Sequence, residues 1–312
     1  MKKHKIIALL IMVMILSSCG RKEIEKITSN TQNDITIDSN YTGSITTPTL
    51  TPEAPNKTPV KLPQTTKEEI NLIQITNNLF VNVINSTSIN LPNEINGYSV
   101  SWEFDNSFFK RTSNQLTLLK NGKSTLTAII GNRYYTNFEI VSENGKFIYS
   151  YQQNLKINYM FVTNSKKLGN KMNPTLIVVH NTANIASAQN EVKYLNSTSN
   201  NTSTSYHFAV DDKEIYQAIP TNVGAYHAGN RAINEKSIGI EIAKSTSKDN
   251  AIKNKAIANG IKLIAMLQAY YDIDTEYVIT HKDASGKHCP HDIIDRYTLD
   301  KFYKELKEKN KA

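Results

Sequence analysis

Two stretches decide how the C-terminal half of this chain folds: Thr175-Leu-Ile-Val-Val-His180 and His281-Lys-Asp-Ala-Ser-Gly-Lys287-His-Cys289-Pro290. The first is a short apolar run that predicts a buried strand with a histidine at its end. The second follows a similar apolar run, so a second strand is also expected to end in a histidine. Two histidines and one cysteine are the ligand types of a catalytic zinc ion that keeps a fourth position open for water. The sequence therefore predicts that His180, His281 and Cys289 bind one Zn²⁺.

The residues around these stretches predict an α/β domain that covers residues 148–312. Further strand-like runs lie at 205–210 and 238–242. A helix is expected over about 252–271, where isoleucines and a leucine recur at helical spacing, and another is expected after Ser187. Strands that alternate with helices indicate a central mixed sheet flanked by helices.

One carboxylate is expected to face the predicted metal site. In Ile238-Gly-Ile-Glu-Ile242 the isoleucines occupy one face of a strand, and Gly239 and Glu241 occupy the other. A carboxylate flanked by aliphatic side chains is partly desolvated, which raises its pKa toward the range of a general base. The alternative is a solvated glutamate near the end of a strand.

The N-terminus predicts export. Residues 1–18 have a basic start and an apolar run from Ile6 to Leu16 that is short for a membrane span. The run ends in Leu16-Ser-Ser-Cys19-Gly20, which resembles a bacterial lipobox, so cleavage before Cys19 and lipidation of its thiol are expected. The alternative is an ordinary signal peptide with a cysteine there by chance. Because the chain has only two cysteines, a lipidated Cys19 leaves Cys289 without a disulfide partner.

Two segments lie between the signal and the α/β domain. Residues 19–66 are rich in Thr, Ser, Asn and Pro, and this composition predicts a disordered tether. Residues 67–147 contain alternating apolar runs separated by turn signals such as Asn121-Gly122, a pattern that predicts a small all-β sandwich with Trp102 in its core. Ile89-Asn-Leu-Pro and Gly97-Tyr-Ser-Val-Ser-Trp102 resemble bacterial Ig-like domains. We interpret this domain as a spacer, with weak wall binding as the alternative.

The C-terminal domain resembles the zinc-dependent N-acetylmuramoyl-L-alanine amidases of the phage-lysozyme and peptidoglycan-recognition-protein superfamily, often called amidase family 2. The similarity covers most of the last 150 residues, and the matching segments follow the order of the family. These segments are Leu176-Ile-Val-Val-His180-Asn-Thr-Ala-Asn, Ser205-Tyr206-His-Phe-Ala-Val-Asp, Ile215-Tyr-Gln-Ala-Ile-Pro, Ala225-Tyr-His227-Ala-Gly, Ser237-Ile-Gly-Ile-Glu241-Ile and His281 to Pro290.

The resemblance also implies roles for individual residues. Glu241 matches the glutamate that activates water, and Lys287 matches a lysine that stabilises the developing oxyanion, although a plain solvated lysine is the alternative. Tyr206 matches a tyrosine near the zinc-bound water, although a core tyrosine is equally compatible with its position. His227 and Asn181 are assigned to substrate contact. His207, His288 and His291 fit the metal site less well than the three predicted ligands.

The function implied is hydrolysis of the amide between N-acetylmuramic acid and the L-alanine of the stem peptide in peptidoglycan. The predicted protein is lipid-anchored outside the bacterial cell membrane and faces the wall, and a monomer is the default expectation. A formal net charge of +8 suits anionic wall polymers, whereas no arginine-rich stripe indicates nucleic acid. The alternatives are a catalytically silent muropeptide receptor on the same fold, a surface adhesin that uses the Ig-like domain, and a zinc peptidase that cuts within the stem peptide.

Overall fold

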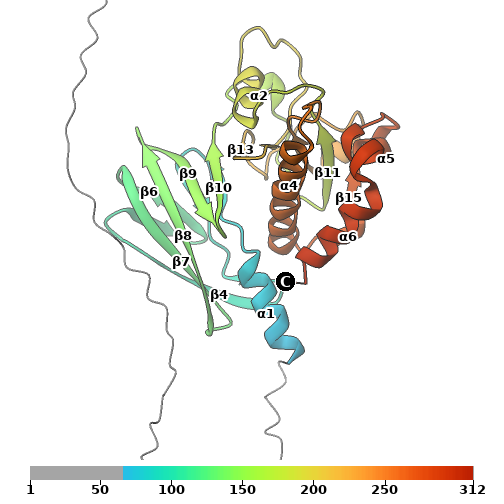
Figure 1. Ribbon diagram of the computed structural model, residues 1–312. Coiled ribbons are helices and arrows are strands. Elements are labelled where there is room, and N and C mark those ends of the chain that lie inside the picture. Colours follow the sequence, from blue (N-terminus) through green and yellow to red (C-terminus); the bar gives the residue numbers. More distant parts are fainter. Residues whose placement is uncertain (1–65, 312) are drawn as a thin grey trace, which may run out of the picture. The chain divides into compact units, whose positions relative to one another are not determined.

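The computed structural model describes residues 66–311, and Figure 1 shows the arrangement of their helices and strands. The predicted signal peptide, the lipidation site Cys19 and nearly all of the predicted tether lie outside the described residues. Within residues 66–311, no helix combines the length and apolar character needed to cross a bilayer.

The first element is a helix, α1 (Lys67–Asn77), in a region for which the sequence pattern predicts only β structure. The all-β prediction is therefore wrong at this end. The Thr66 side chain accepts from the Glu69 backbone N–H, and the Glu69 carboxylate accepts from the Thr66 N–H. This capping box starts the helix, and Leu72 and Ile75 bury its apolar side. The Thr-x-x-Glu spacing is a readable signal that the alternation-based prediction did not use.

Residues 82–152 form two antiparallel sheets that share one core. Val83, Phe109 and Leu116 of the four-stranded sheet are buried with Trp102 and Phe138 of the larger sheet. Trp102 lies in this core as predicted. The smaller sheet has the strand order β1 (Asn82–Asn85), β2 (Ser88–Asn90), β6 (Gln115–Leu118) and β5 (Phe109–Thr112); the facing strands are β3 (Glu94–Ile95), β4 (Tyr98–Phe104), β7 (Gly122–Ile130), β8 (Tyr134–Glu143) and β9 (Lys146–Gln152).

The larger sheet continues without interruption into the C-terminal domain. Strand β9 pairs antiparallel with β10 (Leu155–Tyr159), and β10 pairs parallel with β13 (Ile215–Gln217). Eleven strands therefore form one sheet in the order β15-β11-β14-β12-β13-β10-β9-β8-β7-β4-β3. The domain boundary predicted at 147/148 falls inside β9, so backbone hydrogen bonds hold both sides of it together.

The C-terminal part of the sheet is mixed, as predicted. Strand β14 (Ser237–Ile242) pairs parallel with β11 (Leu176–Asn181) and β12 (Phe208–Val210), and β11 pairs parallel with β15 (Val278–Thr280). Only the β12–β13 pair within this part is antiparallel. The remaining described elements are the helices α2 (Ala188–Leu195), α3 (Arg231–Asn234), α4 (Asn250–Tyr271), α5 (His281–Ser285) and α6 (Leu299–Lys309), with single turns at Ser165–Lys167, Thr275–Tyr277 and Ile293–Tyr297.

Helices cover both faces of this part of the sheet. The aliphatic face of β11 and β14 packs on α4, whose buried side includes Ile257, Ile261 and Ile264. On the other face, Val192 and Leu195 of α2 pack near Ala209 of β12. Helices α2 and α4 begin close to where the sequence predicts them, and Ser187 caps α2, because its side chain accepts from the Asn190 N–H.

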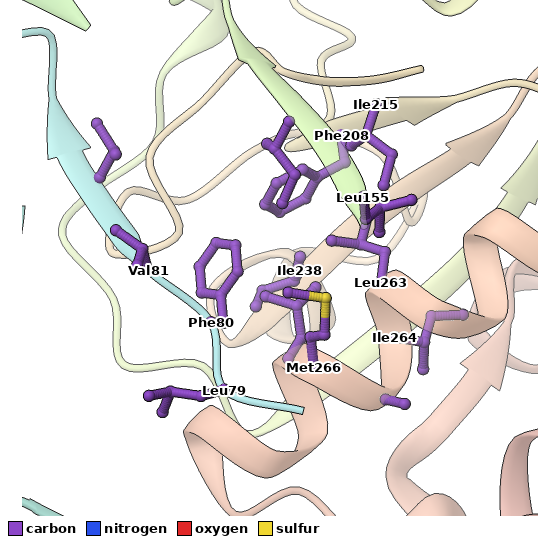
Figure 2. Packing of buried hydrophobic residues seen from close by; sticks show 14 of the residues in the cluster. Leu79, Phe80, Val81, Leu155, Phe208, Ile215, Ile238, Leu263, Ile264 and Met266 are labelled. Atoms are coloured by element: carbon purple, nitrogen blue, oxygen red, sulfur yellow. The ribbon is translucent and has the colours of Figure 1, made fainter. Parts of the chain in front are cut away.

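The segment before β1 belongs to the core of the C-terminal domain. Figure 2 shows Phe80 turned toward Phe208 and Met266, with the side chains of Leu79 and Val81 on the opposite side of this segment; all of them are buried in one continuous core. The Phe80 ring contacts the Phe208 ring edge-on, with a centroid distance of 6.2 Å. Burial of these apolar side chains stabilises the two parts jointly.

A closed ring of hydrogen bonds adds polar contacts at this junction. Asn82 Nδ2 donates to Tyr271 Oη at 3.0 Å, and that hydroxyl donates to Thr221 Oγ1 at 2.6 Å. Thr221 Oγ1 then donates to Asn82 Oδ1 at 2.8 Å. Because each group in the ring both donates and accepts, the buried polar atoms compensate one another.

Candidate active site

The three predicted metal ligands lie together in the structure. The ligand atoms of His180, His281 and Cys289 are all within 4.8 Å of one another, and the Nδ1 atoms of the two histidines are 3.0 Å apart. All three side chains are buried. Among the described residues this is the only cluster of at least three His, Cys, Asp or Glu side chains with metal-binding geometry. Two imidazole nitrogens and one sulfur fit a zinc ion with an open position.

Parallel strand pairing brings the histidines together. His180 is the penultimate residue of β11, and β11 lies directly beside β15. The prediction that His281 ends a strand is wrong by one residue: β15 ends at Thr280, and His281 begins α5. The Thr280 side chain caps this helix by accepting from the Asp283 N–H, which fixes the backbone at the ligand.

A tight turn returns the chain to place the cysteine. Helix α5 ends at Gly286, whose φ of 80° is a left-handed conformation that glycine adopts readily. The Lys282 N–H then donates to the Cys289 carbonyl at 2.8 Å, and the Asn181 N–H donates to Cys289 Sγ at 3.4 Å. Burial raises the pKa of the Cys289 thiol to about 11, so metal binding would have to displace its proton.

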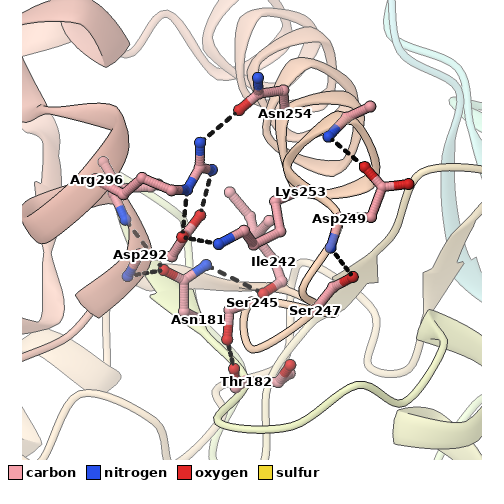
Figure 3. Close-up of polar contacts among 12 residues, drawn as sticks. Asn181, Thr182, Ile242, Ser245, Ser247, Asp249, Lys253, Asn254, Asp292 and Arg296 are labelled. Atoms are coloured by element: carbon pink, nitrogen blue, oxygen red, sulfur yellow. Dashed lines mark hydrogen bonds and ion pairs between the residues drawn. The ribbon is translucent and has the colours of Figure 1, made fainter.

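Asn181 holds the segment that follows the cysteine, as Figure 3 shows. Its Oδ1 accepts from the Asp292 N–H at 3.0 Å, and its Nδ2 donates to the Ile242 carbonyl at 3.2 Å. Asp292 in turn accepts from Arg296 at 2.6 and 2.7 Å and pairs with Lys253 at 3.1 Å. The sequence predicts a substrate contact for Asn181, and the structure places its side chain among these buried structural bonds.

Glu241 faces the metal ligands as predicted. It lies opposite His180 in the parallel β11–β14 register, so the two side chains leave the same face of the sheet. Its Oε2 is buried and has no hydrogen-bond partner among the described residues. Burial raises the pKa of Glu241 to about 8; the charge of Glu191 acts in the same direction, and Lys287 opposes it. A carboxyl group with such a pKa is able to take up and return a proton near neutral pH.

Glu191 is a residue near the site that the sequence analysis does not identify, and its charge acts on both Glu241 and Tyr206. It lies on α2, accepts from Asn184 Nδ2 at 2.7 Å, and burial raises its pKa. No local pattern reveals it, because its approach to Glu241 depends on how α2 packs across the sheet.

Tyr206 and Lys287 also lie near Glu241. The Tyr206 hydroxyl is buried without a partner in the described part of the chain, and burial, followed by the charges of Glu241 and Glu191, raises its pKa. Lys287 is exposed, and its charge lowers the pKa of His281 after the larger effect of burial. The structure therefore brings both predicted residues to the site.

The other histidines take different positions. His227 is buried against His180, with its Nδ1 at 3.1 Å from His180 Nε2, and burial lowers the pKa of His227 to about 3. The predicted substrate-contact residue thus lies behind a metal ligand. His207 accepts from the Gly239 N–H at Nδ1 and donates from Nε2 to the Val223 carbonyl, and His288 is exposed beside Asp295. Neither His207 nor His288 joins the ligand cluster, as predicted.

A cavity of about 760 Å³ adjoins the ligand cluster. Tyr226, Arg231 and Asn170 are among the residues that line it, and Gly229 forms the wall nearest the metal ligands. A Cβ atom at Gly229 would lie 3.7 Å from His281 Nε2. The cavity therefore reaches the surroundings of His281 through Gly229, while none of the three predicted metal ligands lines it.

Comparisons with known proteins relate this domain to wall amidases. Residues 170–292 match the family model described as N-acetylmuramoyl-L-alanine amidase. The chain is 43% identical over 147 residues to N-acetylmuramoyl-L-alanine amidase CwlA of Bacillus subtilis (strain 168). This match covers 45% of this chain and 53% of that protein. N-acetylmuramoyl-L-alanine amidase XlyA of the same organism is 42% identical over 154 residues, which covers 48% of this chain and 50% of that protein.

Among solved structures, the catalytic domain of XlyA matches with 39% identity and a TM-score of 0.43, over 48% of this chain and 98% of that chain. The chain spans about half the length of the curated relatives it matches.

Proposed function

We propose that this protein is a zinc-dependent peptidoglycan hydrolase that cleaves the amide between N-acetylmuramic acid and the L-alanine of the stem peptide. The observation that carries the proposal is the buried cluster of His180, His281 and Cys289 next to a carboxyl group with a raised pKa. The matched family model and the relatives named as amidases supply the bond that is cut. They also favour hydrolysis over a silent muropeptide receptor.

His180, His281 and Cys289 would hold the ion, whose chemistry is to lower the pKa of a bound water and to polarise a carbonyl. Glu241 takes the proton from the attacking water and later returns it to the departing amide nitrogen, which a pKa near neutrality permits. The Lys287 ammonium stabilises the negative charge that develops on the carbonyl oxygen. The unpartnered Tyr206 hydroxyl donates to water or to the substrate carbonyl.

The placement of the enzyme is a further part of the proposal. Lipidation at Cys19 would anchor the protein outside the membrane, residues 20–65 would act as a tether, and the two-sheet region would serve as an Ig-like spacer. The lipobox-like sequence and the tether composition support this arrangement. Globomycin, which blocks lipoprotein signal cleavage, should cause an unprocessed form to accumulate. A secreted form with unmodified Cys19 would contradict the anchor.

The activity is tested on the purified chain, loaded with zinc and incubated with defined muramyl peptides. Mass spectrometry should detect intact sugar and a separate peptide that begins at L-alanine, and both products should disappear in Cys289→Ala. Residues 66–147 should stay in the protein, since Phe80 packs against Phe208 and Tyr270 of the C-terminal domain. Binding without cleavage would support the receptor, and cleavage inside the peptide would support a zinc peptidase.

A further inference from the structure

The buried contact between His227 and His180 determines which nitrogen of His180 is free to bind a metal. His180 uses both ring nitrogens: Nδ1 faces His281 Nδ1 at 3.0 Å, and Nε2 faces His227 Nδ1 at 3.1 Å. The two rings are perpendicular, with centroids 5.1 Å apart. His227 is 5% exposed and lies behind the ligand cluster. Its contact with the cluster therefore passes through His180.

The two Ser237 oxygens beside His227 Nε2 favour one set of proton positions in this pair. His227 Nε2 lies 3.4 Å from the Ser237 carbonyl oxygen, which only accepts hydrogen bonds, and 3.3 Å from the Ser237 hydroxyl, which can donate or accept. With the proton of the neutral His227 ring on Nε2, both Ser237 oxygens can accept from it and Nδ1 is left as an acceptor, whereas the opposite tautomer would set the Nε2 lone pair against the carbonyl oxygen. His180 Nε2 must then donate to His227 Nδ1, so His180 Nδ1 keeps its lone pair and points it toward His281.

We propose that His227 is a positioning residue, which holds His180 in the Nε2–H tautomer so that Nδ1 is presented to the metal. This inference rests on the proposed zinc site and adds to it a residue that contacts a metal ligand without binding the metal itself. Metal-bound histidines generally donate their second ring N–H to a fixed acceptor, and loss of that acceptor weakens metal affinity. Here the acceptor is a second histidine, which is itself oriented by the backbone of β14.

The surroundings of His227 keep its ring in one place. Its backbone N–H donates to Asn234 Oδ1, which also accepts from the Ala228 N–H. The ring lies against Gly239, where a Cβ atom would be 2.5 Å from His227 Cγ. Any side chain at residue 239 would therefore displace the ring, and this explains why glycine occupies that position of β14.

The first test measures the tautomer directly in the metal-free protein. Nitrogen-15 NMR of the histidine rings should show His180 protonated at Nε2 in the wild type. His227→Leu keeps the bulk and removes the acceptor, so His180 should become a mixture of tautomers. His227→Asn places an amide oxygen close to the position of Nδ1 and should restore the Nε2–H form. Ser237→Ala keeps the carbonyl and should leave the tautomer unchanged.

The second test measures zinc affinity by competition with a chelator, and it does not depend on turnover. His227→Leu should weaken zinc binding about 10- to 100-fold, and His227→Asn should recover most of the loss. If His227→Leu proves unstable, Gly239→Ala displaces the ring and should weaken zinc binding in the same way.

An Nδ1–H tautomer in the wild type, or zinc affinity that is unchanged in folded His227→Leu, would overturn the proposal. A lower melting temperature of the metal-free variant with an unchanged tautomer would assign His227 a purely structural role. If both tests succeed and muramyl peptides are not cleaved, only the proposed function fails.

Discussion

Replacing Glu241 with glutamine should abolish turnover and stabilise the metal-free protein. The carboxyl group is held where burial raises its pKa from 4.5 to about 8. The folded pKa of Glu241 lies above the unfolded value. The wild-type protein is therefore not destabilised by this group below about pH 4.5, and its free energy of unfolding decreases as the pH rises toward 8. Proton linkage over that interval lowers the free energy of unfolding of the wild type by about 3 kcal/mol at pH 7. This value is an upper bound because the Glu241 side chain keeps some contact with solvent.

Glutamine carries no charge at any of these pH values, so the variant should not lose this stability. The free energy of unfolding, measured by urea denaturation in the presence of a chelator, should differ little between the proteins at pH 5. Between pH 5 and 8, the free energy of unfolding of the variant should exceed that of the wild type by a progressively larger amount. Zinc should reduce the difference, since a nearby cation favours the ionised carboxylate. The exposed strand residue Glu103 supplies a matched control, Glu103→Gln, which should show no such gain.

Turnover of muramyl peptides should fall by a factor of about 10² to 10⁴ in Glu241→Gln, while zinc content is kept. A metal-free variant that is less stable than the wild type at pH 8 would refute the desolvation argument. A variant that retains turnover within tenfold of the wild type would show that Glu241 is not the general base.

Three further substitutions test other parts of the structure. Asp292→Asn should cost about 1.5–3 kcal/mol at pH 7 by urea unfolding, because two partly buried cations lose their charged partner. Since burial raises the pKa of Asp292 less than those cations lower it, the cost should disappear as the pH falls below 3.8. Tyr271→Phe opens the hydrogen-bond ring at the junction and should cost about 1–3 kcal/mol by the same method. Lys287→Met should reduce kcat about 10²- to 10³-fold at unchanged zinc content, whereas Lys282→Met, at a neighbouring exposed position, should leave kcat unchanged.

The sequence predicted the parts of the site that depend on short-range patterns. The alternation around Glu241 predicted which face of its strand carries it, and the structure places this side chain opposite His180 on the same face of the sheet. The ligand set was predictable because cysteine is so rare in this chain that Cys289 stands out. Burial and the resulting pKa of Glu241 followed from its aliphatic neighbours, as expected.

The remaining features depend on contacts between residues far apart in the sequence. The positions of Glu191 and His227 require α2 and the 224–229 loop to pack across the sheet, which no local period encodes. The continuity of the sheet through β9 and β10 was equally hidden, because an antiparallel hairpin looks the same whether it closes one domain or joins two. The substrate roles predicted for His227 and Asn181 depended on the family motif, which identifies a residue type and not the direction of its side chain.

The distribution of hydrogen bonds separates the residues that build the site from those that face its ligand. His180, Asn181 and His227 have their polar atoms engaged by other buried groups. Glu241 Oε2 and the Tyr206 hydroxyl are buried without a partner in the described part of the protein. An unpaired buried polar atom costs about 1–3 kcal/mol, a cost that is offset when water or substrate supplies the missing bond. Because these two unpaired groups also interact electrostatically with each other beside the ligand cluster, they are the ones expected to interact with the reacting atoms, and the paired groups are expected to hold the metal ligands in place.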